Sequence, residues 1–393
     1  MPHRAWPPGA ASFAVFFFAY YGYIGVFAPY ASPYFSGQGM SAAQIGVLMS
    51  LIQVLRIFGP NLWGWVADRS GQRARILRLT AWGSMLAFSG LLFGQGFAWF
   101  FFVMVMINLF SSAQVPLSEA LLLGELRGDL THYGRLRLWG SVGFIVAVTL
   151  GGQVLDWQGI DFLPWLALLT LGFTVAASTR IHETPSLEVH HDVPSVASLL
   201  RRREVIAFFV SAFLMLAAHA AIYVFYSLHL EQLGYSKTVI GMMWSLGVLA
   251  EIVFFFYQAP IFRRFSVRAL MLASFGLAVL RFLMIGFGAD TLVLLLLAQC
   301  LHAATFGAHN SASVLTLQRW FAGPLQARGQ ALFISISYGL GGTLGGLLMS
   351  LVWDAYGSAA VFLVAALFAA GGAGAAFLSY RWQRTILQCT NMA

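Results

Sequence analysis

Runs of about 20 apolar residues, separated by short polar segments, repeat along the whole chain. Each run is long enough to form a helix that crosses the roughly 30 Å hydrocarbon layer of a bilayer. The pattern predicts six such helices in the first half of the chain, at residues 11–34, 41–66, 76–95, 98–122, 137–155 and 162–179. It predicts six more in the second half, at residues 206–230, 237–259, 268–288, 291–316, 327–352 and 357–380. We interpret the first run as a membrane helix, because it is too long for the apolar part of a cleavable signal peptide.

One long polar stretch, residues 180–205, lies between the two sets of helices. We interpret it as a cytoplasmic linker between an N-terminal half, residues 1–179, and a C-terminal half, residues 206–380. Residues 381–393 would then form a cytoplasmic tail.

A short internal repeat supports two similar halves. The sequence Thr-Leu-Gly-Gly at residues 149–152 recurs at residues 343–346, about half a chain length later. Two related six-helix halves are typical of large secondary transporters, whose substrate site lies near the bilayer midplane between the halves.

The composition excludes a soluble protein. Hydrophobic residues make up 59% of the chain and charged residues only 9%, against about 25% charged residues in soluble domains. Most of the 22 Lys and Arg residues fall in loops on one side of the twelve-helix arrangement, whereas Lys237 falls on the opposite side. Positive loops stay in the cytoplasm, so we expect a multi-pass protein of a bacterial inner membrane with both termini cytoplasmic. The positive charge therefore reports orientation and does not indicate nucleic-acid binding.

The two cysteines have no metal-site spacing, and we expect no metal and no cofactor.

The loop between the second and third predicted helices reads G-W-V-A-D-R-S-G-Q-R at residues 64–73. This resembles the loop signature of the major facilitator superfamily. Gly64 would allow close helix packing, and Gly71 a tight turn. Asp68 would face the positive N-terminal end of the eleventh helix. The resemblance implies a conformational latch formed by Gly64, Asp68, Arg69, Gly71 and Arg73. The alternative is a solvated turn whose arginines only set the orientation.

Three further stretches read YGRLRLWGSVG at residues 133–143, GVLAE at 247–251 and LHAATFG at 301–307. They resemble the phenylpropionate permease family and, more distantly, the lactose permease-like proton symporters. The resemblance implies an all-α membrane fold of twelve helices in two six-helix halves, and proton-coupled symport.

Ionisable residues inside membrane helices are costly and usually mark a pathway. Arg56 lies too deep in the second predicted helix to reach the surface easily. Glu251 lies near the equivalent depth in the eighth, so we expect an intramembrane charge pair of Arg56 and Glu251. A purely structural ion pair is the alternative.

The resemblance also implies a proton-coupling network of Glu251, Arg281 and His302. A buried carboxyl group holds a proton and releases it when an arginine approaches, so Glu251 would be the proton carrier and Arg281 the displacing cation. His302 would be the relay. Thr305 stands where the related symporters have a second acid, and Arg281 alternatively extends to the outer membrane surface.

Candidate substrate-binding residues come from the resemblance and from helical spacing. Glu119 and Arg137 have the separation of the substrate-binding pair in lactose permease-like symporters; alternatively, both are solvated at the membrane edge. His302 and His309 are seven residues apart and share one face of an α-helix. Similar spacing groups polar and aromatic residues in the first and seventh helices. The remaining predicted substrate contacts are His309, Tyr23, Tyr30, His219, Tyr223 and Tyr226. Packing is the alternative role for the tyrosines, and a hydrogen-bonded core position for the histidines.

These observations favour a monomeric, proton-driven symporter of a small organic solute that works by alternating access. The expected substrate is an aromatic acid; sugars and nucleosides remain alternatives, as does a proton-driven efflux antiporter. A membrane sensor without transport activity is the alternative from a different class. An enzyme is not expected, since no nucleophile elbow, phosphate loop or metal-ligand cluster is present.

Overall fold

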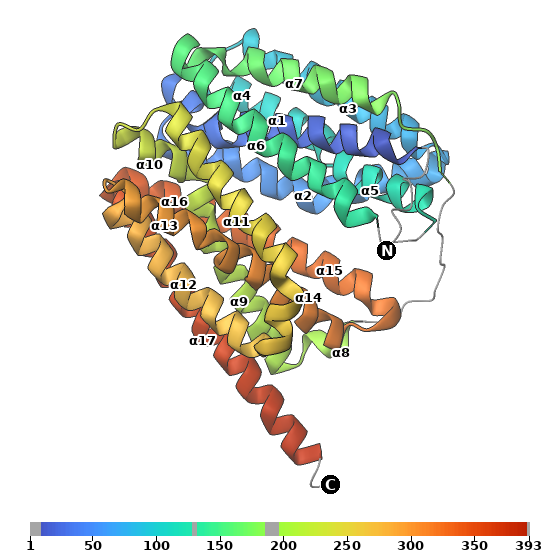
Figure 1. Ribbon diagram of the computed structural model, residues 1–393, viewed down its shortest axis with the longest axis vertical. Helices are drawn as coiled ribbons and strands as arrows, with labels where there is room; N and C mark the ends of the chain where they lie inside the picture. The colour runs from blue at the N-terminus through green and yellow to red at the C-terminus, as the bar shows by residue number, and fades with distance from the viewer. Residues whose placement is uncertain (1–8, 128–131, 185–195, 391–393) are drawn as a thin grey trace. The chain divides into compact units, whose positions relative to one another are not determined.

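The computed structural model describes residues 9–127, 132–184 and 196–390, which fold almost entirely into helices (Figure 1). The chain forms two compact units. The first comprises Met1–Val189 and Gly234–Ser245, and the second comprises His190–Leu233 and Leu246–Ala393.

The first unit contains the six helical segments expected for the N-terminal half. They are α1 (Ala10–Gly37), α2 (Ala42–Ser70), α3 (Arg73–Ser89) with η1 (Gly90–Leu92), α4 (Phe97–Ser111) with α5 (Gln114–Glu125), α6 (Tyr133–Gln158), and η2 (Ile160–Phe162) with α7 (Leu163–Ser178). Helix α1 packs along both α6 and α7, and α3 packs against α4 and α7. The buried core of this unit is therefore centred on α1.

The second unit contains the rest of the chain, and helix α11 (Lys237–Arg264) is divided between the two units. Its other elements are α8 (Ala197–Leu200), α9 (Arg203–Ala220), η3 (Ala221–Phe225), α10 (Tyr226–Gln232), α12 (Val267–Gly288), α13 (Leu292–Cys300), η4 (Ala303–Ala308), α14 (His309–Trp320), η5 (Gly323–Leu325), α15 (Gln326–Phe333), η6 (Ile334–Gly341), α16 (Gly342–Tyr356) and α17 (Ser358–Thr390). Helix α17 packs along α9 and α12.

All twelve predicted membrane helices correspond to helical segments of the structure. Within the described residues, eleven are long and apolar enough to cross a membrane. The third, α3, is only 17 residues long and continues as the 3-10 turn η1, which explains why it falls short of that length. The predicted linker lies partly outside the described residues, and the predicted tail begins as a continuation of α17.

Glycines allow the backbones of the central helices to touch in both units. A Cβ atom at Gly25 of α1 would lie 2.6 Å from the carbonyl oxygen of Phe144 in α6. In the second unit, a Cβ atom at Gly345 of α16 would lie 2.6 Å from the carbonyl oxygen of Ala217 in α9. The obstacle is backbone in each case, so no side-chain movement can relieve it.

Replacing Gly25 or Gly345 by alanine should lower the free energy of unfolding by about 1–3 kcal/mol, because the new methyl group forces two backbones apart. Thermal unfolding of the purified protein in detergent measures the effect. Gly172→Ala is the matched control, since a Cβ atom there meets nothing within 4 Å; an equal loss of stability in this control would contradict the packing argument.

Candidate functional site

The first unit brings a cation, an anion and two aromatic rings together where α1, α5 and α6 meet. Arg137 donates from Nε to Glu119 Oε1 at 3.3 Å and from Nη2 to the hydroxyl oxygen of Tyr21. Its guanidinium also lies over the Tyr21 ring at 4.1 Å and near the Phe17 ring at 5.5 Å. Tyr133 hydrogen bonds to the same carboxylate of Glu119. The predicted pair of Glu119 and Arg137 is therefore in contact, and aromatic rings lie beside the guanidinium.

The two tyrosines predicted to contact substrate from α1 are enclosed by packing. Tyr23 is 2% exposed; its ring stacks on Phe27 and meets Phe88 edge to face. Tyr30 is fully buried, and its hydroxyl group lies among backbone carbonyl groups. These surroundings match the packing alternative, and substrate contact by Tyr23 or Tyr30 stays a prediction.

Arg281 of α12 is buried in the second unit with a set of uncharged hydrogen-bond acceptors. Its Nε donates to the carbonyl oxygen of Ala298 at 3.0 Å, and its Nη1 donates to Thr305 Oγ1 at 3.1 Å. Its Nη2 donates to Gln299 Oε1 at 3.4 Å, and Gln299 Nε2 donates to the hydroxyl oxygen of Tyr226. Arg281 is only 1% exposed, so its side chain does not extend to the membrane surface.

Glu251 of α11 and His302 face one another in the same unit. His302 Nε2 lies 3.9 Å from Glu251 Oε1, a distance that makes an ion pair when the imidazole is protonated. Within the described residues, Glu251 Oε1 and His302 Nδ1 are buried without a hydrogen-bond partner. The charge of Arg281 also acts on Glu251. The three residues predicted for proton coupling therefore form one electrostatic cluster.

The helix between His302 and His309 is not α-helical, so the α-helical spacing that grouped them does not describe this segment. Residues Ala303–Ala308 form the π-helical segment η4, whose wider turns change the direction in which later side chains point. Thr305 faces Arg281, whereas the His309 ring meets Phe275 of α12 edge to face, with centroids 5.3 Å apart. Thr305 and His309 thus both contact α12, and a common face of His302 and His309, like a substrate role for His309, stays a prediction.

A second π-helical segment, η3, interrupts the predicted stripe of His219, Tyr223 and Tyr226. His219 is buried, with Nδ1 2.9 Å from the carbonyl oxygen of Met215 and its ring centroid 6.4 Å from that of His302. Tyr223 lies beside His219, with ring centroids 6.3 Å apart. Tyr226 instead belongs to the Arg281 network through Gln299. The predicted stripe is therefore divided: His219 lies beside Tyr223 and His302, whereas Tyr226 contacts Gln299.

Sequence reasoning missed Gln299 and Tyr21. Gln299 is a buried amide in the apolar run that precedes His302. Its position three residues before that histidine was the signal that could have identified it. Tyr21 was passed over because helical spacing selected Tyr23 and Tyr30 on another stripe of α1.

The predicted pair of Arg56 and Glu251 stays a prediction. Arg56 belongs to the first unit and is exposed, whereas Glu251 belongs to the second.

The loop at residues 64–73 has a defined turn. Gly71 ends α2 with a left-handed backbone, φ +63°, and donates to the carbonyl oxygen of Ala67. Asp68 accepts from Arg73 at 2.8 Å, and the Arg69 guanidinium lies over the Trp65 ring. The predicted tight turn at Gly71 is present.

One other feature of this loop differs from expectation, and a further one was not predicted. A Cβ atom at Gly64 would meet nothing within 4 Å in the described structure, so the close helix packing predicted there is not found. The carboxylate of Glu183, which follows α7, accepts from the backbone N–H groups of Arg73 at 3.2 Å and Ala74 at 2.9 Å. Glu183 thus caps the N-terminus of α3, where the helix dipole favours a negative charge.

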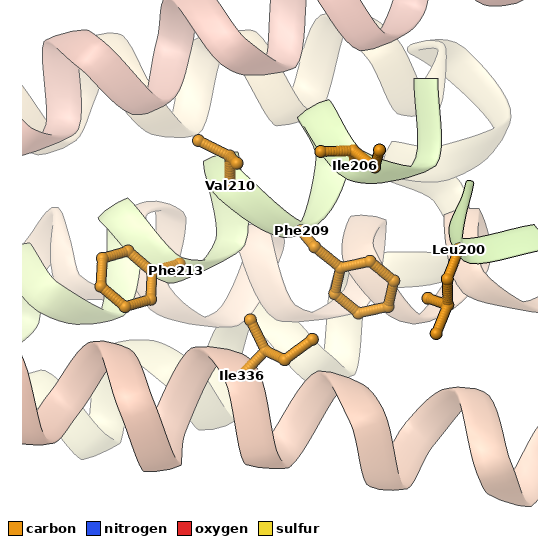
Figure 2. A pocket seen from close by; sticks show the side chains of 6 residues that line it. All are labelled: Leu200, Ile206, Phe209, Val210, Phe213 and Ile336. Atoms are coloured by element: carbon orange, nitrogen blue, oxygen red, sulfur yellow. The ribbon is translucent and has the colours of Figure 1, made fainter. Parts of the chain in front are cut away.

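An apolar pocket of about 380 Å³ lies between α9 and η6 (Figure 2). Its lining residues are all apolar: Leu200, Ile206, Phe209, Val210, Phe213 and Ile336. None of the polar candidates lines it, so it does not provide the chemistry expected of a site for a polar solute.

Comparisons with known proteins agree with this architecture. The MFS_1 like family matches residues 10–364. The probable 3-phenylpropionic acid transporter of Escherichia coli is 32% identical over 303 residues, covering 75% of this chain and 78% of that protein. The maltose permease of Geobacillus stearothermophilus is 28% identical over 273 residues, with 67% of each chain covered. The crystal structure of the nucleoside transporter NupG superimposes with a TM-score of 0.83 at 17% identity, covering 95% of this chain and 99% of that chain.

The fold and these relatives define a multi-pass membrane transporter of the major facilitator superfamily, of a kind found in bacteria, and not an enzyme. Within that superfamily, the chain belongs to the MFS_1 like family.

Thr305→Val should lower the free energy of unfolding by about 1–3 kcal/mol, because it leaves one N–H of the buried Arg281 guanidinium without an acceptor. Thr305→Ser keeps the hydroxyl group and should behave like the unchanged protein. Thermal unfolding of both variants in detergent provides the comparison. Equal stability of the valine and serine variants would show that this hydrogen bond contributes nothing.

Proposed function

We propose that the protein is a secondary active transporter that couples the uptake of a small organic solute, an aromatic acid, to proton entry. The observation that supports coupling most directly is the Glu251–His302 pair beside a buried arginine. Burying charge in a membrane protein is costly, and such groups usually serve ions or substrates.

The proton step would use Glu251 as the carrier. Its Oε1 atom has no hydrogen-bond partner among the described residues, so the carboxyl group is available for a proton. Arg281 is held by Ala298, Thr305 and Gln299, all neutral acceptors, and is therefore not committed to a carboxylate by these bonds. A movement that brings the guanidinium closer to Glu251 would favour the carboxylate and release the proton, and His302 is placed to pass it on.

The solute would bind at the Arg137 cluster of the first unit. An arginine donates parallel hydrogen bonds to a carboxylate, which suits an organic acid. The rings of Tyr21 and Phe17 beside the guanidinium offer an aromatic surface to a substrate ring. The likeness to a probable 3-phenylpropionic acid transporter supports an aromatic acid. The likeness to a maltose permease and to a nucleoside permease keeps sugars and nucleosides as alternatives.

We further propose a monomer in a bacterial inner membrane, with both termini cytoplasmic and the proton as the coupling ion without any other cofactor. The positions of the arginines support this orientation. Efflux by proton antiport is the alternative direction, and a sensor would bind solute without net flux.

The deciding experiment uses the protein reconstituted in vesicles with an internal pH indicator. Adding 3-phenylpropionate should cause proton entry and solute accumulation, whereas maltose and a nucleoside should not. Proton exit on solute entry would indicate antiport, and binding without counterflow would indicate a sensor.

Glu251→Gln should abolish proton-driven accumulation of the solute while leaving solute exchange across the vesicle membrane, since the amide cannot cycle a proton. Accumulation by the variant at the rate of the unchanged protein would overturn the assignment of Glu251 as proton carrier. Glu231→Gln, on α10, is a matched control for loss of a carboxylate.

Arg137→Lys should raise the Kd of the solute about 10- to 100-fold, because lysine keeps the charge but loses the planar pair of donors and the stacking on Tyr21. Binding is measured by isothermal titration of the detergent-purified protein. Arg135→Lys, two residues away in the same helix, should leave the Kd unchanged.

A further inference from the structure

Among the described helices, α11 is the one that the two compact units share. Residues Gly234–Ser245, which include its first turns, belong to the first unit, and the helix continues from Leu246 in the second. The contacts of those first turns with α6 therefore lie within the first unit, but they hold a helix that continues into the second unit.

Asp156, near the end of α6, caps the N-terminus of α11. Its Oδ1 accepts from the backbone N–H of Lys237 at 2.7 Å, and its Oδ2 accepts from that of Thr238 at 2.8 Å. The side chains of Ser236 and Thr238 hydrogen bond to the same carboxylate. The first N–H groups of a helix lack partners within the helix, and a carboxylate both accepts from them and complements the helix dipole. Here a different helix supplies the cap.

Two further polar contacts follow the same interface away from the cap. The hydroxyl group of Tyr30, on α1, lies 2.8 Å from the carbonyl oxygen of Val148 and 3.0 Å from that of Lys237. Thr149 Oγ1 lies 2.8 Å from Ser245 Oγ, two turns further along α11. Side-chain hydroxyl groups therefore connect to α11 at two levels, one of them fully buried and the other partly buried.

Two glycines bring the backbones of α6 and α11 into direct contact. A Cβ atom at Gly152 would collide with the carbonyl group of Lys237, and one at Gly241 would lie 2.5 Å from the carbonyl oxygen of Val148. Because backbone opposes backbone at both points, a larger residue at either glycine would push the two helices apart.

We propose that Asp156 is a gating residue whose cap on α11 is made in one stage of the transport cycle and released in another. This inference rests on the proposed function, in which the two units move as bodies during alternating access. A helix that belongs to both bodies cannot stay docked on α6 and also follow the second unit. The polar part of the attachment consists of hydrogen bonds, which water can replace when the helices separate.

The test measures the separation of α6 and α11 directly. Cys300 and Cys389 are first replaced by serine, and spin labels are placed at Gln153→Cys on α6 and Met242→Cys on α11, both exposed positions. Electron–electron resonance in nanodiscs then gives the distance distribution. Asp156→Ala should increase the population with separated helices roughly 2- to 30-fold, the factor expected from loss of a helix cap.

A second, independent variant and a matched control complete the design. Gly152→Ala should also increase the separated population, through steric contact and not through loss of charge. Asp161→Asn removes a nearby carboxylate that accepts from Gln38 and should leave the distribution unchanged. A distribution in Asp156→Ala identical to that of the unchanged protein would overturn the gating proposal. Because the distance measurement needs no substrate, failure of transport in the vesicle assay would contradict the proposed function separately.

Discussion

The structure depends on one constraint of the bilayer: a polar group inside it must find its partner within the protein. Arg281 shows how this shapes the second unit, because three acceptors from the neighbouring span surround one guanidinium. Arg137 meets the same requirement differently, with Glu119 and the face and hydroxyl group of Tyr21. The described residues thus hold one arginine by neutral groups in the second unit and the other by a carboxylate in the first.

The fold was largely predictable from the sequence because hydrophobic runs report membrane thickness independently of packing. Every predicted span corresponds to helix, and the short α3 is the one whose length departs from the pattern. The division of the continuous helix α11 between the two units was not predictable. It depends on contacts of Asp156 and Gly152 with a helix about 80 residues later, and hydropathy contains no information on such pairings.

The candidate site was predictable in its ionisable residues but not in its geometry. Arg281, His302 and Glu251 stand out because charge and imidazole are rare in apolar runs. Helical spacing was a poor guide in the same region, since the π-helical segment η3 widens the turn between His219 and Tyr226, which α-helical periodicity places together. π-Helical segments frequently occur at functional sites, so a position where α-helical periodicity breaks down is itself a pointer to such a site. Gln299 illustrates the remaining gap, because an uncharged amide gives a weak signal before its partners are known.

Glu183 and Thr184 fix the segment that follows α7 to two other helices of the first unit. Glu183 accepts from the backbone N–H groups at the start of α3, and the adjacent Thr184 donates to the carbonyl oxygen of Leu121 in α5. The described part of this segment is therefore not a free connection, because its polar groups join the end of α7 to α3 and α5. A change at either residue would release one of these attachments without touching any apolar contact.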